Sequence, residues 1–131
     1  MPTELRVGDF LKLQLLRWDI RAPVKIICHG FGKSHLTGPA LQLKPAYFAT
    51  LSRVNIIVVD WSKLAGQPQG QMLELAGVTY LLPAIIVQEV GRQTALLIRF
   101  LTEKIKAPVR NVHLIGHGLG AHAMVRFFSP P

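Results

Sequence analysis

Three short runs of branched apolar residues constrain the fold of this 131-residue chain more than any other feature. They read "VKIIC" at residues 24–28, "VNIIVVDW" at 54–61 and "VHLIG" at 112–116. Short apolar runs of this kind are typical of β-strands, and a continuous apolar centre indicates a sheet that is covered on both faces. We therefore expect three buried strands.

The segments between these runs predict helices. Residues 38–51 predict a partly helical stretch that Pro45 interrupts, and residues 119–128 predict a helix after the third strand. Residues 83–106 predict a longer helix, with a proline in its first turn and Pro108 beyond its end. One face of it carries residues at three- and four-residue steps, namely Val87, Val90, Thr94, Leu97, Leu101 and Ile105. Alternating strands and helices predict a parallel α/β sheet.

The composition suits one compact domain. Half of the residues are hydrophobic and 17% are charged, which excludes a disordered tail. We divide the chain into an N-terminal segment, residues 1–22, and a domain, residues 23–131. The net charge is +8, but the basic residues are scattered singly rather than clustered with aromatic residues. This pattern argues against nucleic-acid binding and is compatible with an anionic lipid surface.

Cys28 is the only cysteine, so no disulfide can form within the chain. Its apolar neighbours predict a small buried side chain rather than a nucleophile. The N-terminus carries Glu4 and Asp9 and does not resemble a secretory signal. The longest uncharged stretch, near residues 75–88, is short for a membrane span and contains Pro83, so we expect no transmembrane segment.

The glycine-rich turn within "HLIGHGLGAHA", residues 113–123, is open to three interpretations. The first is a dinucleotide-binding turn formed by Gly116, Gly118 and Ala121. That motif needs an acidic residue about twenty positions later to hold a ribose hydroxyl, and no acidic residue follows Gly118. A nucleotide-binding module is therefore only a weak alternative.

The second interpretation is a metal site built from histidines. The five histidines match none of the familiar zinc spacings, and no cysteine or carboxylate accompanies those of the turn; they are His29, His35, His113, His117 and His122. We therefore predict no metal and no cofactor.

The third interpretation is a nucleophile elbow, the G-x-S-x-G turn that presents a serine above the end of a sheet. Gly116 and Gly120 occupy the two flanking glycine positions, and His117 follows Gly116 directly. The position of the serine is occupied by Gly118. The turn alone is weak evidence for an elbow.

Four ordered blocks strengthen that interpretation: "VKIICHGFG", "VNIIVVDWS", "YLLPAIIVQEVGRQTALLIRFL" and "NVHLIGHGLGAHAMV". Together they resemble the pancreatic-type lipases and their insect relatives, which include yolk proteins that share the fold without the activity. The resemblance spans roughly residues 24–125. It implies an α/β-hydrolase fold, truncated at its C-terminal side, with a mostly parallel sheet and flanking helices.

The resemblance also assigns positions in the site. It implies an oxyanion hole formed by the backbone N–H groups of Phe31 and Leu119, which does not depend on a serine. It makes Asp60 a strand-end residue near the site, because the family's catalytic acid follows the nucleophile in the chain. His122 lies directly after the turn and is not the catalytic base. Neither Ser34 nor Ser62 sits on a strained turn beside a base.

With nucleophile, acid and catalytic histidine all missing, we expect a lipase-family domain that does not hydrolyse esters and that binds a lipid-like or other hydrophobic ligand. The alternative is an N-terminal fragment of an active lipid ester hydrolase. The resemblance implies an extracellular protein, although the N-terminus carries no recognisable signal. An uncovered strand edge predicts self-association.

Overall fold

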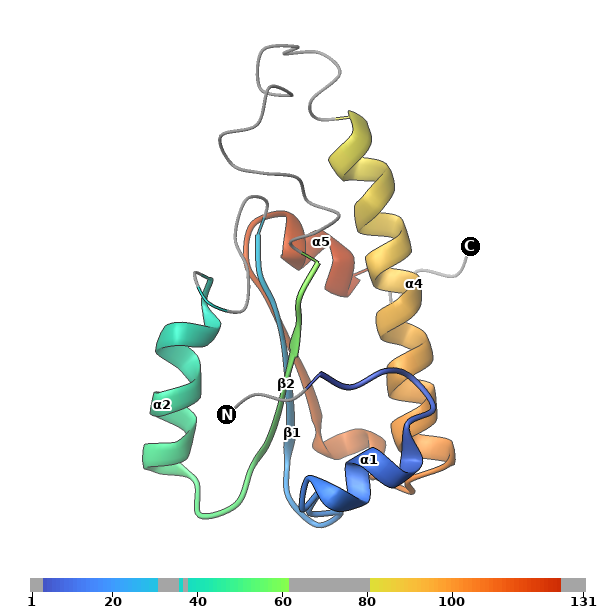
Figure 1. The fold of residues 1–131 in the computed structure, drawn as a ribbon. Helices are drawn as coiled ribbons and strands as arrows, with labels where there is room; N and C mark the ends of the chain where they lie inside the picture. The colour runs from blue at the N-terminus through green and yellow to red at the C-terminus, as the bar shows by residue number, and fades with distance from the viewer. Residues whose placement is uncertain (1–3, 31–35, 37, 62–80, 126–131) are drawn as a thin grey trace.

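The computed structural model describes residues 4–30, 36, 38–61 and 81–125 (Figure 1). Within these described residues the chain forms three strands and five helical segments. In order, they are α1 (Phe10–Leu15), β1 (Val24–Cys28), α2 (Ala40–Thr50), β2 (Asn55–Val59), α4 (Leu81–Glu103), the 3-10 turn η2 (Val109–Asn111), β3 (Val112–Gly116) and α5 (Leu119–Val125).

The three strands form a parallel sheet in the order β2-β1-β3, which confirms the predicted parallel arrangement. Val24 of β1 lies opposite Asn55 on one side and Val112 on the other. At the far end Cys28 lies opposite Val59 and Gly116. Because the strands are in register, the sheet has a distinct amino end and a distinct carboxyl end.

Helices lie on both sides of this sheet, as expected for an α/β-hydrolase fold (Figure 1). α2 lies on one side, and α4 lies on the other side together with α5. The chain reaches β2 on one side of β1 and then crosses to β3 on the other side. The carboxyl end beside β1 is therefore the point at which the strand order reverses, where open α/β sheets bind their ligands.

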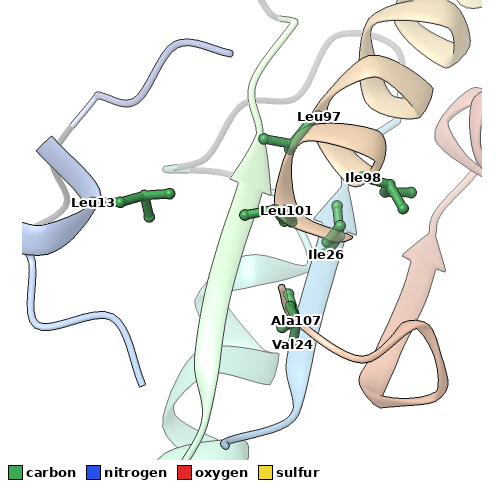
Figure 2. Close-up of a cluster of buried hydrophobic side chains, with 7 residues drawn as sticks. All are labelled: Leu13, Val24, Ile26, Leu97, Ile98, Leu101 and Ala107. Carbon is green, nitrogen blue, oxygen red and sulfur yellow. The ribbon is translucent and has the colours of Figure 1, made fainter. Parts of the chain in front are cut away.

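The main core lies between α4 and the sheet (Figure 2). Leu97, Ile98 and Leu101 of α4 pack against Val24 and Ile26 of β1. Leu13 from α1 joins the same cluster and is only 2% exposed. The N-terminal helix, which the sequence did not predict, is thus part of the core.

The long helix α4 confirms the predicted apolar face. Val87, Val90, Leu97 and Leu101 are buried, and the buried Thr94 hydroxyl donates a hydrogen bond to the Val90 carbonyl at 2.8 Å. The helix ends three residues earlier than predicted, at Glu103. Beyond it the chain adopts a left-handed conformation, with a φ of 66° at Lys106.

The prediction that Pro45 interrupts the second helix is wrong, because α2 continues through it from Ala40 to Thr50. A proline removes the hydrogen bond to the carbonyl four residues earlier, which here belongs to Leu41. Leu41 is 57% exposed, so water can satisfy that carbonyl. The helix tolerates the proline because α2 lies at the surface.

The last helix is confirmed over the part that can be compared. α5 spans Leu119–Val125, and residues 126–128 of the predicted helix lie outside the described residues. Across the described ranges, none of the helices combines the length and the apolar character that crossing a bilayer requires.

Candidate functional site

Three chain segments meet at the carboxyl end of the sheet. His29 and Gly30 follow β1, Asp60 and Trp61 follow β2, and the glycine turn follows β3. The shared register of the strands places these segments side by side. All three therefore contribute to one site at the end of the sheet.

His29 is buried at the centre of this site, with 1% exposure. Its Nδ1 lies 2.8 Å from the Gly30 carbonyl oxygen, and its Nε2 accepts the backbone N–H of Trp61 at 2.9 Å. These two contacts assign the proton of a neutral ring to Nδ1. Asp60 Oδ1 lies 3.1 Å from the same Nε2, a contact that becomes an ion pair only when the ring is protonated.

Trp61 fixes the end of β2 to the end of β1. Its indole N–H donates to the His29 carbonyl oxygen at 2.8 Å. The two rings stack with centroids 5.4 Å apart and planes 7° apart. Trp61 is 3% exposed, so these contacts are made away from solvent, where hydrogen bonds contribute most to a unique structure.

The glycine turn packs directly against β1. The His117 N–H donates to the Cys28 carbonyl oxygen at 3.1 Å. A Cβ on Gly120 would overlap the carbonyl oxygens of Cys28 and His29, and a Cβ on Gly116 would overlap the backbone of Ala121. Both positions therefore require glycine because no space remains for a side chain.

Gly118 differs from both neighbouring glycines. Its φ is 60°, in the left-handed region, and among the described residues a Cβ there would meet only the Cα of Gly30, at 3.7 Å. The Ala121 N–H donates to the Gly118 carbonyl at 3.0 Å, which joins the turn to the start of α5. Among the described residues, the turn thus leaves room for a Cβ at Gly118, in a backbone conformation that favours glycine.

Cys28 lies beneath this turn and is fully buried. Burial raises the pKa of its thiol to about 12, so the group stays protonated at neutral pH. This confirms the prediction of a small buried residue and excludes Cys28 as a thiolate nucleophile in the folded state.

The structure places some of the other predicted site residues. Leu119 begins α5 and packs against the cluster that contains Cys28, Trp61 and Met124. His117 is exposed at the turn and His122 is exposed on α5. Four of the residues considered for the site lie outside the described residues: Phe31, Ser34, His35 and Ser62.

The sequence of the chain matches a known family. The sequence model of the family described as Lipase matches residues 8–126. The chain belongs to the lipase family. This confirms the resemblance found in the sequence, and the α/β-hydrolase fold of that family agrees with the parallel sheet and its flanking helices.

Individual lipase-family proteins show the same relationship. The chain is 32% identical to a phospholipase A1 of Vespa basalis over 103 residues, which are 79% of this chain and 33% of the wasp protein. It is 32% identical to pancreatic lipase-related protein 2 of Rattus norvegicus over 116 residues, 88% of this chain and 22% of the rat protein.

A third relative is the phospholipase A1 VesT1.02 of Vespa tropica. It is 31% identical over 131 residues, which cover 93% of this chain and 42% of that protein. The chain therefore spans less than half the length of these curated relatives. It resembles triacylglycerol and phospholipid hydrolases through the part of the lipase fold that it contains.

The sequence did not predict the bonded pair of His29 and Trp61 in this lipase domain. The sequence carried a usable signal, because each of the two residues closely follows an apolar strand and these strands end at the same end of the sheet. Pairing those strands requires knowing that β1 and β2 are neighbours in register, and this is a tertiary fact.

Proposed function

We propose that this lipase domain no longer hydrolyses esters and binds a lipid-like or other hydrophobic ligand at the carboxyl end of its sheet. One observation carries the proposal: Gly118 lies between Gly116 and Gly120, at the point where the resemblance to lipases would place the nucleophile. Acyl transfer through a covalent intermediate needs a side-chain oxygen at this point, and glycine has none.

The geometry of the turn supports ligand binding without catalysis. The expected oxyanion donors, Phe31 and Leu119, would act through backbone N–H groups, which do not depend on a serine. Among the described residues a Cβ on Gly118 would meet only the Cα of Gly30, and Leu119 belongs to the apolar cluster beneath the turn. A polar acyl head group near main-chain donors and a hydrocarbon tail near apolar side chains would suit this combination.

Two further expectations belong to the same proposal. An extracellular location follows from the family to which the chain belongs. Self-association would use the open edges of β2 and β3, each of which has one strand neighbour among the described residues.

The activity half of the proposal is tested with a fluorophosphonate probe and a panel of short- and long-chain esters. We expect no labelling and no turnover by the native chain, and none by Gly118→Ser, because a lone serine without its base is a weak nucleophile. The heat-unfolded chain serves as the control. Turnover by the folded native chain well above that control would overturn the proposal.

The binding half is tested with a fluorescent long-chain fatty acid. We expect saturable binding that Gly118→Phe weakens by filling the space beside Gly30. Gly8→Phe is the matched control, because Gly8 also has a positive φ, 96°, and no atom of the described residues lies within 4 Å of a Cβ there. Circular dichroism checks that both variants fold. Equal binding by the two variants would contradict a ligand site at the turn.

The alternative is that the chain is the N-terminal part of an active lipid ester hydrolase. The observation in its favour is that the chain spans less than half the length of its curated relatives. Ester turnover by a longer protein that carries this chain together with a later acid and histidine would favour this alternative, because these residues supply the missing parts of a triad.

A further inference from the structure

Positive charge gathers at the amino end of the sheet, opposite the elbow. Arg21, Arg53 and Arg110 precede the first residues of β1, β2 and β3 by two or three positions, and those first residues pair in register. The segment after α4 reaches the same end, because Ala107 packs in one cluster with Val24 (Figure 2). This segment carries Lys104 and Lys106, and Arg17 lies just after the end of α1.

We call these six cations the basic edge: Arg17, Arg21, Arg53, Lys104, Lys106 and Arg110. All six are exposed. The segments that carry them, residues 16–21, 51–54 and 103–111, contain two carboxylates, Asp19 and Glu103. Asp19 lies 3.5 Å from Arg53, and Glu103 lies 3.2 Å from Arg99 of α4. A clear excess of positive charge therefore faces solvent.

Large apolar side chains are exposed beside these cations. Leu11 and Leu15 are 74% and 82% exposed, and because they are one helical turn apart they share a face of α1. Leu16, Ile20 and Val109 are also exposed, and they lie within residues 16–21 and 103–111, which carry cations of the basic edge. Exposed apolar residues next to cations are typical of surfaces that lie in a membrane interface.

We infer that the basic edge, with Leu11 and Leu15, docks on a bilayer that contains anionic lipids. Charge complementarity favours this partner, and the leucines can enter the boundary between head groups and acyl chains. A nucleic acid would satisfy the cations and leave the leucines in water. A second copy facing the same edge would oppose like charges.

The docking edge and the elbow lie at opposite ends of the same strands (Figure 1). A chain docked in this way holds the Gly118 turn away from the bilayer. The inference is therefore independent of the proposed ligand site, and Gly118→Ser should bind vesicles as the native chain does.

The charge contribution is tested by co-sedimentation with vesicles of phosphatidylcholine and phosphatidylserine in equal parts, and with vesicles of phosphatidylcholine alone. We expect binding to the first and little to the second. The triple variant Arg21→Gln, Lys106→Gln and Arg110→Gln should bind roughly a hundredfold more weakly, at about fivefold for each cation.

The matched control removes two charges elsewhere, through Lys44→Gln on α2 with Arg92→Gln on α4, and is compared with the double variant Arg21→Gln and Arg110→Gln. This variant should keep most of the binding. Equal losses in the two double variants would show that net charge alone attracts the chain, and would overturn the inference.

The apolar contribution is tested with Leu11→Ser and Leu15→Ser together, which should weaken vesicle binding on the order of tenfold. The pair Leu41→Ser and Phe48→Ser on α2, with 57% and 59% exposure, is the control and should have little effect. Equally tight binding to duplex DNA that the Leu11 and Leu15 changes leave untouched would assign the edge to a polyanion. A change in oligomeric state caused by the same pair would assign it to a second copy. Either result would overturn the inference.

Discussion

The two tryptophans lie at opposite ends of the sheet and are held in different ways. Trp61, at the carboxyl end, donates its indole N–H to the His29 carbonyl and stacks on the His29 ring. Trp18, at the amino end, packs against the cluster around Leu13, and its buried indole nitrogen has no hydrogen-bond partner among the described residues. One tryptophan is fixed by directional polar contacts and the other by apolar packing, while the buried Asn55 side chain supplies the polar contacts of the amino end through two hydrogen bonds to the Asp19 backbone.

This difference extends to the backbone. At the carboxyl end, Gly116 and Gly120 leave no room for a side chain. At the amino end, Arg17 and Lys106 adopt positive φ angles of 59° and 66°, a backbone conformation that glycine adopts with less strain. Conformational strain at the surface is tolerated, whereas atomic overlap in the closely packed turn is not. The carboxyl end therefore tolerates less substitution than the amino end.

The largest expected effect is that of Gly120→Ala. Its Cβ would overlap two backbone carbonyls of β1 and the segment after it, so the turn must move, at a cost of about 3 kcal/mol or more. Gly118→Ala is the control and should cost about 1 kcal/mol, through its positive φ alone. Denaturant unfolding followed by circular dichroism measures both. Equal costs would show that crowding at Gly120 is not what makes this end intolerant.

The next effect compares the two tryptophans directly. Trp61→Phe removes the donor to the His29 carbonyl and should lower the free energy of unfolding by about 1–2 kcal/mol beyond the loss of ring size. Trp18→Phe removes the same atoms but no hydrogen bond within the described structure, so it should cost less. If Trp18→Phe costs as much as Trp61→Phe, the contrast between the two ends fails.

A smaller effect, of opposite sign, is expected at the end of α1. The backbone N–H of Trp18 donates to the Leu13 carbonyl at 3.4 Å, and the backbone N–H of Arg17 donates to the Gln14 carbonyl at 3.3 Å. This pattern usually places glycine at the residue with positive φ, which here is Arg17. Arg17→Gly should therefore raise the free energy of unfolding by about 0.5–1 kcal/mol. Arg21→Gly, at an exposed neighbour, is the control. A destabilised Arg17→Gly would show that this end is more tightly specified than we infer.

The smallest expected effect is an absence of reaction at Cys28. In the folded chain its thiol should not react with a disulfide reagent at pH 8, because it is buried and its pKa is raised to about 12. Unfolding in guanidinium provides the control, in which the thiol should react at once. Rapid labelling of the folded chain would show that the carboxyl end opens readily.

The same pKa predicts the direction of alkaline sensitivity. The protonated thiol is favoured in the folded state, so its contribution to stability is complete below pH 9 and decreases as the pH rises toward 12. Cys28→Ala should remove this part of the pH dependence. Unchanged alkaline unfolding in that variant would assign the dependence to other groups.

Much of the fold could be predicted from periodicity alone. The branched runs at Val24–Cys28 and Val112–Gly116 became strands with the expected bounds, and the apolar face of α4 from Val87 to Leu101 became its buried side. These elements bury residues at a regular spacing, so local pattern and tertiary environment agree. Prediction was poorer for helices that bury few of their residues, because burial then imposes little regular spacing of apolar residues. Pro45 stays within the exposed helix α2, and the six-residue helix α1 was not predicted.

The sequence by itself determined that strands and helices alternate, that the chain resembles lipases, and that three glycines, Gly116, Gly118 and Gly120, follow the last strand. The tertiary structure alone decided which ends meet. It placed β1 between β2 and β3, paired His29 with Trp61, and gathered scattered cations at the amino end. The physical reason is that composition and periodicity act along the chain. Strand order and register bring together residues that no local interaction connects.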